Sequence, residues 1–289
     1  MRLGISGQAL GSIMNFAEIV KIGISNGIFD YEIWPSNAPG NGWGYKNRDI
    51  ISVKNVAKQE GIRIGCVTMG DAFNPDIKTD ANGYADALCS AIEAAKELGA
   101  YCVNHYCFHI SMDAPDFARM EEFWKKPLAL AESLGIVLAL ENEAHDSTAT
   151  PEKMLTVLRH FNSPYFKTNF DATNYFHASC EGYPAAYEVL KDYIGYVHLK
   201  NGCLYRDGMP PENTGAPMSG YHEPAPIQYT PLPDGAVNIV GLISRLEEDG
   251  YTGLCSLEPH TTPELVEKFY AREISYLHKL GLFKNGVSQ

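Results

Sequence analysis

Short apolar runs alternate along the whole chain with longer segments in which apolar residues recur every three or four positions. The short runs have the length of strands buried on both faces, and the longer segments have the period of amphipathic helices. The predicted strands cover residues 3–6, 29–34, 63–69, 101–106, 136–141, 166–170, 194–199 and 254–257. The predicted helices cover residues 15–26, 47–60, 82–98, 115–134, 151–160, 184–192, 239–249 and 263–280.

Eight strand–helix units in succession predict an α/β fold, a single (β/α)8 TIM barrel that takes in residues 1–289 as one domain. The alternative, a doubly wound open sheet, favours a glycine-rich phosphate loop after the first strand, and the stretch from Gly4 to Gly7 is too sparse in glycine to form one. Residues 202–236 are rich in proline and glycine. They are predicted to form a long irregular loop after the seventh strand, either a lid over the site or a subunit contact.

The predicted helices have recognisable ends. Four of them are followed by glycine, the residue that most readily takes the left-handed conformation at a helix C-terminus. These are Gly27, Gly61, Gly99 and Gly135. At the start of another helix, Thr150 and Pro151 combine a capping side chain with a first-turn proline.

The composition indicates a globular protein with a sizeable core, since 45% of the residues are hydrophobic and 20% are charged. The net charge of −12 disfavours binding to nucleic acid or to an anionic membrane surface. The N-terminus lacks the apolar core of a signal peptide, and no apolar run approaches the roughly 20 residues that span a bilayer. Seven cysteines without a CxxC pair indicate reduced thiols, and these features together predict a cytoplasmic protein.

Polar side chains lie at the carboxyl ends of the last four predicted strands. Glu141 ends the fifth strand, Asp171 follows the sixth, His198 lies near the end of the seventh, and Glu258 follows the eighth. Each follows an apolar residue, so strand alternation turns the apolar neighbour to the helices and the polar residue to the barrel axis. Active sites of such barrels lie at these carboxyl ends. Three carboxylates and one imidazole suit one divalent cation, Mn²⁺ best, with Mg²⁺, Co²⁺ and Zn²⁺ as alternatives.

Each of these four residues also has an ordinary explanation. A strand-end glutamate is often exposed or paired with a cation, and a lone histidine is often a core residue with its hydrogen bonds satisfied. Four consecutive strands that end in this way are much harder to obtain by chance, so the set as a whole favours a metal site. Glu143 also has inward parity, but the strand is expected to end before it, and it is left out of the predicted set.

The strings LENEAH, FDATN, HLKN and SLEPH resemble the sugar isomerase/epimerase family of xylose isomerase-like barrels, and the resemblance follows the whole chain in strand order. Relatives in this family include ketose 3-epimerases, hydroxypyruvate isomerase, inosose dehydratases and endonuclease IV. The resemblance implies that Glu141, Asp171, His198 and Glu258 bind one divalent metal. It also implies that Glu141 and Glu258 form an acid/base pair on opposite faces of a small sugar, and that the protein forms a homo-oligomer.

The implied reaction begins at a carbon next to a carbonyl. A metal bound to the carbonyl and a neighbouring hydroxyl acidifies the C–H between them. One glutamate removes the proton and the other returns it, to the opposite face in an epimerase or to the next carbon in an aldose–ketose isomerase. The same first step serves a lyase, either a dehydratase or a C-glycoside deglycosidase acting on a 3-keto sugar, and this alternative stays open.

Two further classes are weaker alternatives. A nuclease like endonuclease IV binds three metals through additional histidines and needs a positive surface for DNA, which the charge of −12 disfavours. A binding module without catalysis is the other. Both keep the barrel and change only what its carboxyl end does.

Three polar residues near the predicted metal ligands are candidates for substrate binding. Lys200 lies two positions beyond His198 and shares its inward face, so it is expected to bind an anionic or hydroxylated ligand, unless it pairs with Glu32. His145 resembles a histidine that often follows the fifth-strand glutamate in the family. His105, at the end of the fourth strand, also has a frequent family counterpart.

The remaining candidates follow other strands. Asn174 lies three positions after the aspartate, where several epimerases carry a substrate-binding histidine, and so departs from the pattern of a standard ketose 3-epimerase. His177, one turn further on, is expected to compensate for it. Arg206 is a candidate that no spacing supports. Three aromatic residues follow early strands and are expected either to form an apolar wall against sugar C–H groups or to pack: Trp34, Trp43 and Phe73.

Overall fold

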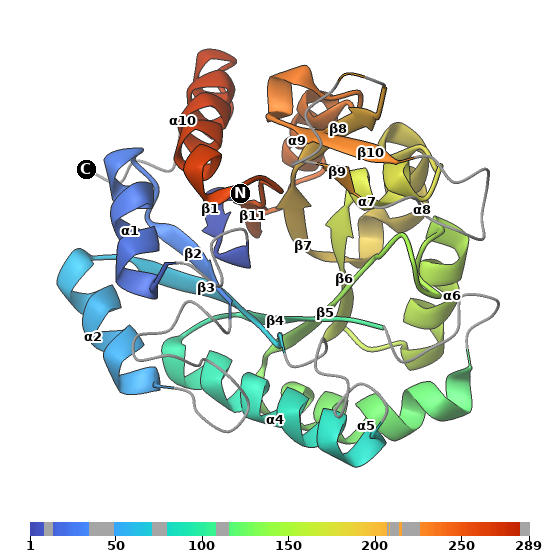
Figure 1. Cartoon of the computed structure of the whole chain (residues 1–289). Coiled ribbons are helices and arrows are strands. Elements are labelled where there is room, and N and C mark those ends of the chain that lie inside the picture. Colours follow the sequence, from blue (N-terminus) through green and yellow to red (C-terminus); the bar gives the residue numbers. More distant parts are fainter. Residues whose placement is uncertain are drawn as a thin grey trace.

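The computed structural model describes residues 1–8, 14–34, 49–70, 80–107, 116–206, 208, 214–215 and 226–283. Within these residues, eight parallel strands close into a barrel (Figure 1). The strands are β1 (Arg2–Ser6), β2 (Asp30–Ile33), β3 (Arg63–Thr68), β4 (Cys102–His105), β5 (Val137–Glu141), β6 (Phe166–Asp171), β7 (Ile194–Leu199) and β11 (Leu254–Leu257). Because β11 pairs with β1, the predicted barrel is confirmed and the open sheet is excluded.

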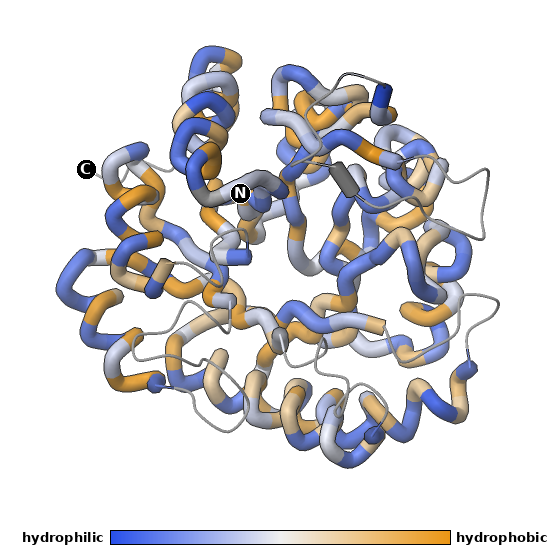
Figure 2. The backbone as a smooth tube through the Cα atoms, viewed as in Figure 1, coloured by the Kyte–Doolittle hydropathy of each residue, from blue (hydrophilic) through white to orange (hydrophobic). Residues whose placement is uncertain are grey.

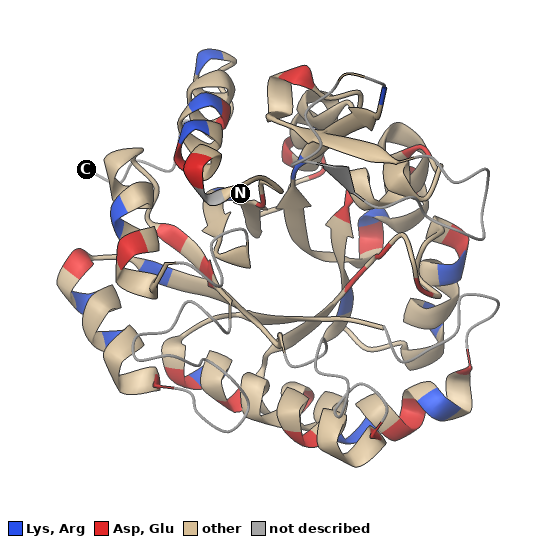
Figure 3. Cartoon of the chain, in the orientation of Figure 1, with Lys and Arg blue, Asp and Glu red and all other residues tan. Residues whose placement is uncertain are grey.

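Helices lie outside the barrel, where right-handed crossovers between parallel strands put them (Figure 1). They are α1 (Phe16–Ser25), α2 (Ile50–Glu60), α4 (Ala81–Leu98), α5 (Phe117–Leu134), α6 (Pro151–Phe161), α7 (Ala172–His177), α8 (Tyr187–Leu190), α9 (Ile239–Glu248) and α10 (Pro263–Lys279). The outer helices carry both hydrophobic and hydrophilic positions (Figure 2) and interspersed acidic and basic residues (Figure 3). Their apolar faces pack on the strands; Phe123 and Trp124 of α5, for example, are fully buried.

The predicted helix ends are present in the structure. All four glycines expected to close helices have positive φ angles: Gly27, Gly61, Gly99 and Gly135. The last three are the C-caps of α2, α4 and α5. At the start of α6 the Thr150 hydroxyl accepts a hydrogen bond of 3.3 Å from the backbone N–H of Lys153. The helix predicted over residues 184–192 is instead divided into η4 (Gly182–Ala186), α8 and η5 (Lys191–Tyr193).

The barrel interior contains an apolar layer and a polar layer. Nearer the amino ends of five strands, a cluster of buried residues packs around the axis: Cys66, Cys102, Ala139, Tyr196 and Leu254. Two positions further along the same strands, the inward residues are polar and buried: Thr68, Asn104, Glu141, His198 and Ser256. The apolar layer therefore closes the barrel beneath a polar layer at the carboxyl ends of the strands.

The segment after β7 is more regular than its sequence suggests. β8 (Asn201–Leu204) and β9 (Thr214–Gly215) both pair with β10 (Ile227–Thr230) in a three-stranded antiparallel sheet. The prediction of an irregular loop is therefore wrong for these residues. The pairing joins positions more than 20 residues apart across proline- and glycine-rich sequence, and a local pattern does not reveal it. A role for this segment as a lid or a subunit contact stays a prediction.

Two buried side chains attach the end of this sheet to the barrel. Asn201 donates hydrogen bonds of 2.9 and 3.0 Å to the carbonyl oxygens of Leu232, in η7 (Leu232–Asp234), and Val237. Its own side-chain oxygen accepts from the N–H of Val237 at 3.0 Å. Glu273 of α10 accepts from the N–H of Leu232 at 3.3 Å. Both side chains are buried, so the backbone just after β10 is held from two sides.

Glu273 predicts a pH dependence of stability. Burial raises the pKa of its carboxyl group to about 8. The folded protein then keeps a proton that the unfolded chain loses near pH 4.5, so stability falls by at most about 1.4 kcal/mol per pH unit as pH rises toward 8. Glu273→Gln should lack this slope. Urea unfolding of both proteins at pH 5, 6.5 and 8 measures it, and parallel pH curves would show that Glu273 is not neutral in the folded state.

None of the helices in the described part of the chain is long and apolar enough to cross a membrane. The seven cysteines are free thiols in the structure, and four of them are buried: Cys66, Cys102, Cys107 and Cys255. Burial raises the pKa of the Cys255 thiol to about 12, so this side chain behaves as a small hydrophobic residue.

Candidate metal centre

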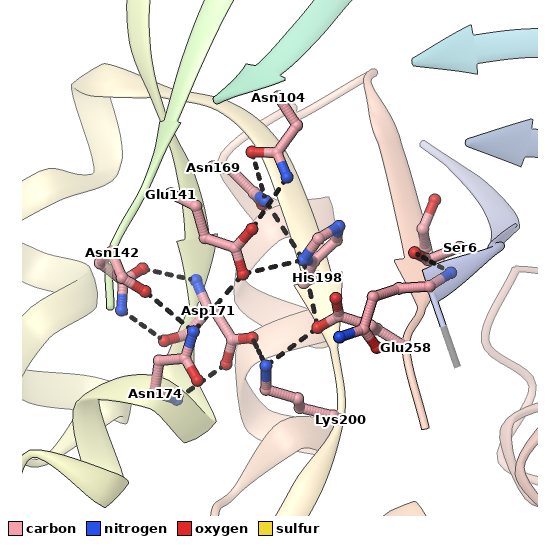
Figure 4. Close-up of polar contacts among 12 residues, drawn as sticks. Ser6, Asn104, Glu141, Asn142, Asn169, Asp171, Asn174, His198, Lys200 and Glu258 are labelled. Carbon is pink, nitrogen blue, oxygen red and sulfur yellow. Dashed lines mark hydrogen bonds and ion pairs between the residues drawn. The ribbon is translucent and has the colours of Figure 1, made fainter. Parts of the chain in front are cut away.

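The four predicted ligands lie together at the carboxyl end of the barrel (Figure 4). Glu141 ends β5, Asp171 ends β6, His198 lies in β7, and Glu258 directly follows β11. Each offers one ligand atom, and these atoms all lie within 4.8 Å of one another. All four residues are at most 2% exposed. The structure therefore brings together the set that strand alternation predicts.

The donor set fits a divalent cation. Three carboxylates and the carboxylate of Glu32 share a buried space with two cationic side chains, Lys200 and the protonated His198 described below, so negative charge is in excess there. Unpaired buried charge is costly, and a doubly positive ion would offset it. Carboxylate oxygens and imidazole nitrogen are ligands of Mn²⁺, Mg²⁺ and Zn²⁺, and the set contains no thiolate.

Glu32 orients the histidine of the cluster. The Nε2–H of His198 donates a hydrogen bond of 2.8 Å to Glu32 Oε2, and both side chains are fully buried. The other ring nitrogen, Nδ1, lies 3.2 Å from Glu141 Oε1 and 3.3 Å from Glu258 Oε2. Glu32 thereby holds a proton on Nε2 and turns Nδ1 toward the cluster, as carboxylates do behind metal-binding histidines.

The charge of His198 follows from the same neighbours. Burial opposes the imidazolium form, but Glu258, Glu32 and Glu141 outweigh it and raise the pKa of His198 well above its usual value. In the metal-free protein the ring therefore carries protons on both nitrogens. A cation that binds at Nδ1 must displace one of them, so metal binding is expected to release a proton.

Buried asparagines fix the carboxylates. Asn104 donates to Glu141 Oε2 at 2.8 Å, and Asn174 donates to Glu141 Oε1 at 3.4 Å (Figure 4). Asn142 joins the ends of β5 and β6 by donating to the carbonyl of Asp171 and accepting from its N–H, both at 2.9 Å. The ligand carboxylates are thus held in place by the protein alone, which is the preorganisation that a metal site needs.

Lys200 lies against the same cluster. Its Nζ is 2.8 Å from Asp171 Oδ2 and 2.9 Å from Glu258 Oε2, and the residue is 3% exposed. Burial alone would lower the pKa of Lys200, but Asp171 and Glu258 outweigh it and raise that pKa well above its usual value. The expected inward direction is found. The alternative pairing of Lys200 with Glu32 is wrong, because Glu32 faces His198 instead.

Lys200→Met is expected to weaken the metal-free fold and strengthen metal binding. Removal of the ammonium leaves two buried carboxylates without their cation, a loss of about 3–5 kcal/mol. The same removal takes away a positive charge that opposes a divalent ion, so the affinity for Mn²⁺ should rise by about tenfold or more. Thermal unfolding with and without metal, together with titration calorimetry, measures both effects. A weaker affinity for Mn²⁺ in the variant would contradict this electrostatic account.

Among the predicted substrate residues, Asn174 contacts the cluster directly through its hydrogen bond to Glu141. Asn174 lies in α7, which begins directly after β6 because Asp171 caps it. His177, at the end of α7, has its ring perpendicular to that of Tyr229, with centroids 6.5 Å apart. Trp34, just after β2, packs edge-on against Tyr106 at 6.3 Å. These are placements only, and the binding roles stay predictions.

The other predicted residues differ in direction and in exposure. His105 faces the helices rather than the axis, between Trp124 and Phe166, with ring centroids at 5.4 and 5.7 Å. Burial lowers the pKa of His105 to about 3, so this ring is neutral. His145 is about half exposed, with Nδ1 3.6 Å from Glu143. Arg206 is exposed just after β8. Trp43 and Phe73 lie outside the described residues.

Several residues of the site were not predicted from the sequence. Glu32 shares the string DYEIW with Asp30, and Asn104 precedes His105 in CVNHY, so neither stands out as a strand-end residue. For Asn104, strand parity counted from the inward residue Cys102 gives the correct direction. Asn169 donates a hydrogen bond of 3.1 Å to Asn104. It lies two positions before Asp171, so strand parity also turns it inward. Tyr229 and His260 also lie beside the cluster; His260 ends the string SLEPH but was not singled out, and Tyr229 carries no sequence signal.

The sequence matches a family model described as xylose isomerase-like TIM barrel over residues 21–280. Among solved structures, the chain is similar to a xylose isomerase-like TIM barrel protein from Mycobacterium smegmatis in complex with magnesium. The TM-score is 0.71 and the identity 18%, over 94% of this chain and 89% of that chain. The sequence matches none of the curated proteins with which it was compared.

Two enzymes are also similar in structure. One is the 3-keto-D-glucoside 4-epimerase YcjR from E. coli, with a TM-score of 0.65 and 17% identity over 96% of this chain and 99% of that chain. The other is the probable 3-DHS dehydratase AsbF from Bacillus anthracis, with a TM-score of 0.70 and 16% identity over 96% of this chain and 99% of that chain. At these identities the likeness shows a shared fold. With the family match over nearly its whole length, the chain belongs to the xylose isomerase-like TIM barrels.

Proposed function

We propose that the protein is a divalent-metal-dependent isomerase or epimerase of a small sugar or sugar derivative. The observation that carries this proposal is the placement of two glutamates in one metal-binding cluster. Glu141 and Glu258 come from β5 and from the end of β11, and His198 Nδ1 lies between them at 3.2 and 3.3 Å. Two carboxylates on either side of one position can remove a proton from one face of a substrate and return it to the other.

Mn²⁺ is the proposed ion, held by Glu141, Asp171, His198 and Glu258, with Mg²⁺, Co²⁺ and Zn²⁺ as alternatives. When bound, such an ion supplies Lewis-acid polarisation of a carbonyl next to the reacting carbon. The proton steps belong to the protein. Burial favours the neutral acid form of Glu258, but His198 and Lys200 outweigh it and hold the pKa of Glu258 well below its usual value. Glu258 is therefore ionised at neutral pH and able to accept a proton.

Lys200 and the asparagines complete the proposed machinery. Lys200 is a cation within the cluster and is suited to hold a substrate oxygen on which negative charge develops. Asn174 and Asn104 keep Glu141 in one orientation. His145, His177, Trp34 and Arg206 stay candidates for contacts with the rest of the sugar. His105 faces the helices and is not proposed to contact substrate.

The second candidate function is a lyase at the same site. Loss of a leaving group next to a carbonyl begins with the same proton abstraction by a glutamate, so the cluster serves both reactions. The similarity to a probable dehydratase as well as to an epimerase favours keeping it. A dehydratase and a C-glycoside deglycosidase acting on a 3-keto sugar are the two forms of this proposal.

One assay separates the two functions. Protein loaded with Mn²⁺ is incubated in D₂O with free ketoses and with 3-keto glucosides, and the products are followed by NMR. Isomerase or epimerase activity gives a rearranged sugar with deuterium at the reacting carbon. Release of an aglycone or formation of an unsaturated sugar without any epimer would overturn the leading proposal in favour of the lyase.

Predictions about partners and location stand as proposals. The net charge of −12 supports a small-molecule substrate over nucleic acid, although the superfamily also contains endonuclease IV. Homo-oligomer formation and a cytoplasmic location are proposed on the family resemblance and on the free cysteines, respectively. Filter binding to DNA at low salt tests the expectation that the protein does not bind nucleic acid. Sedimentation of the purified protein tests homo-oligomer formation.

A further inference from the structure

Two aromatic rings pack together beside the metal cluster. Tyr229 of β10 and His260, which follows β11, have ring centroids 4.5 Å apart at an interplanar angle of 35°. His177 of α7 presents its ring at 90° to that of Tyr229. The three rings thus come from the loops after three different barrel strands. All three are partly exposed, whereas the metal ligands next to them are buried.

These rings directly adjoin the proposed chemistry. His260 Nε2 is 3.4 Å from Lys200 Nζ and 3.6 Å from Glu258 Oε2. Burial raises the pKa of the Tyr229 hydroxyl to about 12, with Lys200 acting to lower it and nearby carboxylates to raise it. The Tyr229 ring packs on His260, which lies within 3.6 Å of both Lys200 and Glu258. A ligand that reached both Glu141 and Glu258 would meet Tyr229 and His260 next.

Access to the cluster comes from the loop side of the barrel. On the opposite side, the apolar layer around Tyr196 closes the axis, and its residues are fully buried. Just above this layer, Glu32 accepts hydrogen bonds from the hydroxyl groups of Thr68 and Tyr196. Substrate atoms that are not rearranged must therefore extend toward the loops, which is where Tyr229 and His260 lie.

The backbone that carries Tyr229 is held by the protein itself. Tyr229 pairs with Gly202 across the β8–β10 ladder. A few residues later, Asn201 and Glu273 hold the backbone at Leu232 by the hydrogen bonds described above. A rigid tyrosine loses little conformational freedom on binding and offers a large apolar face, the combination that favours a contact with another ring.

We infer that Tyr229 and His260 form a binding subsite for a second ring of the substrate. The substrate class is then a glycoside, in which the reacting sugar lies at the metal cluster and a ring aglycone or second sugar packs on Tyr229 and His260. This inference rests on the proposed function for the identity of the reacting part. It differs from that proposal in excluding a free monosaccharide as the preferred substrate.

Binding measurements test the subsite without any need for turnover. Phenyl and methyl glucosides, each as the α and β anomer, are titrated into Mn²⁺-loaded protein by calorimetry. We expect one phenyl glucoside to bind at least about tenfold more tightly than its methyl counterpart, as one good ring contact allows. Tyr229→Leu should reduce that ratio to within twofold, and Tyr229→Phe should retain it. Tyr276→Leu, at a partly buried tyrosine of α10, is the matched control and should leave the ratio unchanged.

The outcomes separate the subsite from the reaction. Equal affinity of the wild-type protein for phenyl and methyl glucosides overturns the subsite, whether or not Tyr229→Leu folds. A phenyl preference that survives in folded Tyr229→Leu overturns it as well. If the preference depends on Tyr229 but no sugar is isomerised, epimerised or cleaved, the proposed function is wrong and the subsite stands. If free ketoses are epimerised without any phenyl preference, the subsite is wrong and the proposed function stands.

Discussion

Glu141→Gln is expected to lower the rate of proton exchange at the reacting carbon by a factor on the order of 10²–10⁴. Glutamine keeps an oxygen that can face the metal and an amide that fits the same space, but it cannot accept a proton. Glu141 is 1% exposed and is hydrogen-bonded by Asn104, so the fold around the variant should persist. Deuterium incorporation into substrate in D₂O measures the step directly. Glu258→Gln should show a loss of similar size.

The metal content of each variant shows whether activity is lost because the base is missing or because the metal no longer binds. Each variant is assayed at saturating Mn²⁺, and its bound metal is measured by elemental analysis in the same sample. Glu267→Gln, an exposed substitution on α10, is the control for charge removal and should leave exchange unchanged. Full exchange activity in metal-loaded Glu141→Gln would show that Glu141 is not part of the proton-transfer pair.

Glu32→Gln is expected to weaken Mn²⁺ binding by about 10–100-fold, although Glu32 is not itself among the four ligands. Its carboxylate accepts the Nε2–H of His198 at 2.8 Å and also accepts from Tyr196 at 3.0 Å. A neutral amide in this place no longer favours a proton on Nε2 and leaves the ring free to turn. Titration calorimetry measures the affinity, and the absorption spectrum of the Co²⁺-loaded protein reports the ligand geometry.

Glu273→Gln is the matched control for Glu32→Gln. It also replaces a fully buried glutamate, but on α10, where it contacts η7 and not the cluster. It should bind Mn²⁺ with wild-type affinity and give a wild-type Co²⁺ spectrum. If both variants lose affinity equally, the effect of Glu32 is one of general stability and not of histidine orientation.

The strands and the positions of the four clustered residues could be predicted because they depend on local pattern. Residues 194–199 and 254–257 are apolar runs whose length matches β7 and β11. At their ends a polar residue follows an apolar one, and the two-residue period of a strand determines which of them faces the axis. Closure of the barrel then brings Glu141, Asp171, His198 and Glu258 together without further information.

The same period explains the failure at β4. His105 was favoured because it ends the strand, yet Asn104 is the residue that faces the axis and donates to Glu141. Parity counted from Cys102, which faces the axis, gives the correct direction. Family resemblance had favoured the histidine.

The remaining parts of the site depend on contacts between distant segments. β10 pairs with β8 across a stretch that contains many prolines and glycines, and β10 carries Tyr229, which packs on His260 beside Lys200. The inward direction of Lys200 was predicted correctly. Its partners are Asp171 and Glu258, and not Glu32, which was the alternative. Choices among several nearby carboxylates are made by three-dimensional geometry, which strand parity does not specify.

The most direct test of the metal centre is a crystal structure of the protein loaded with Mn²⁺, with the ion located by its anomalous scattering. The account predicts one ion per chain, bound by carboxylate oxygens of Glu141, Asp171 and Glu258 and by Nδ1 of His198, with Nε2 of that ring still bonded to Glu32. An ion bound elsewhere, or a fully loaded crystal in which this cluster holds no metal and Lys200 keeps both of its carboxylate partners, would contradict it.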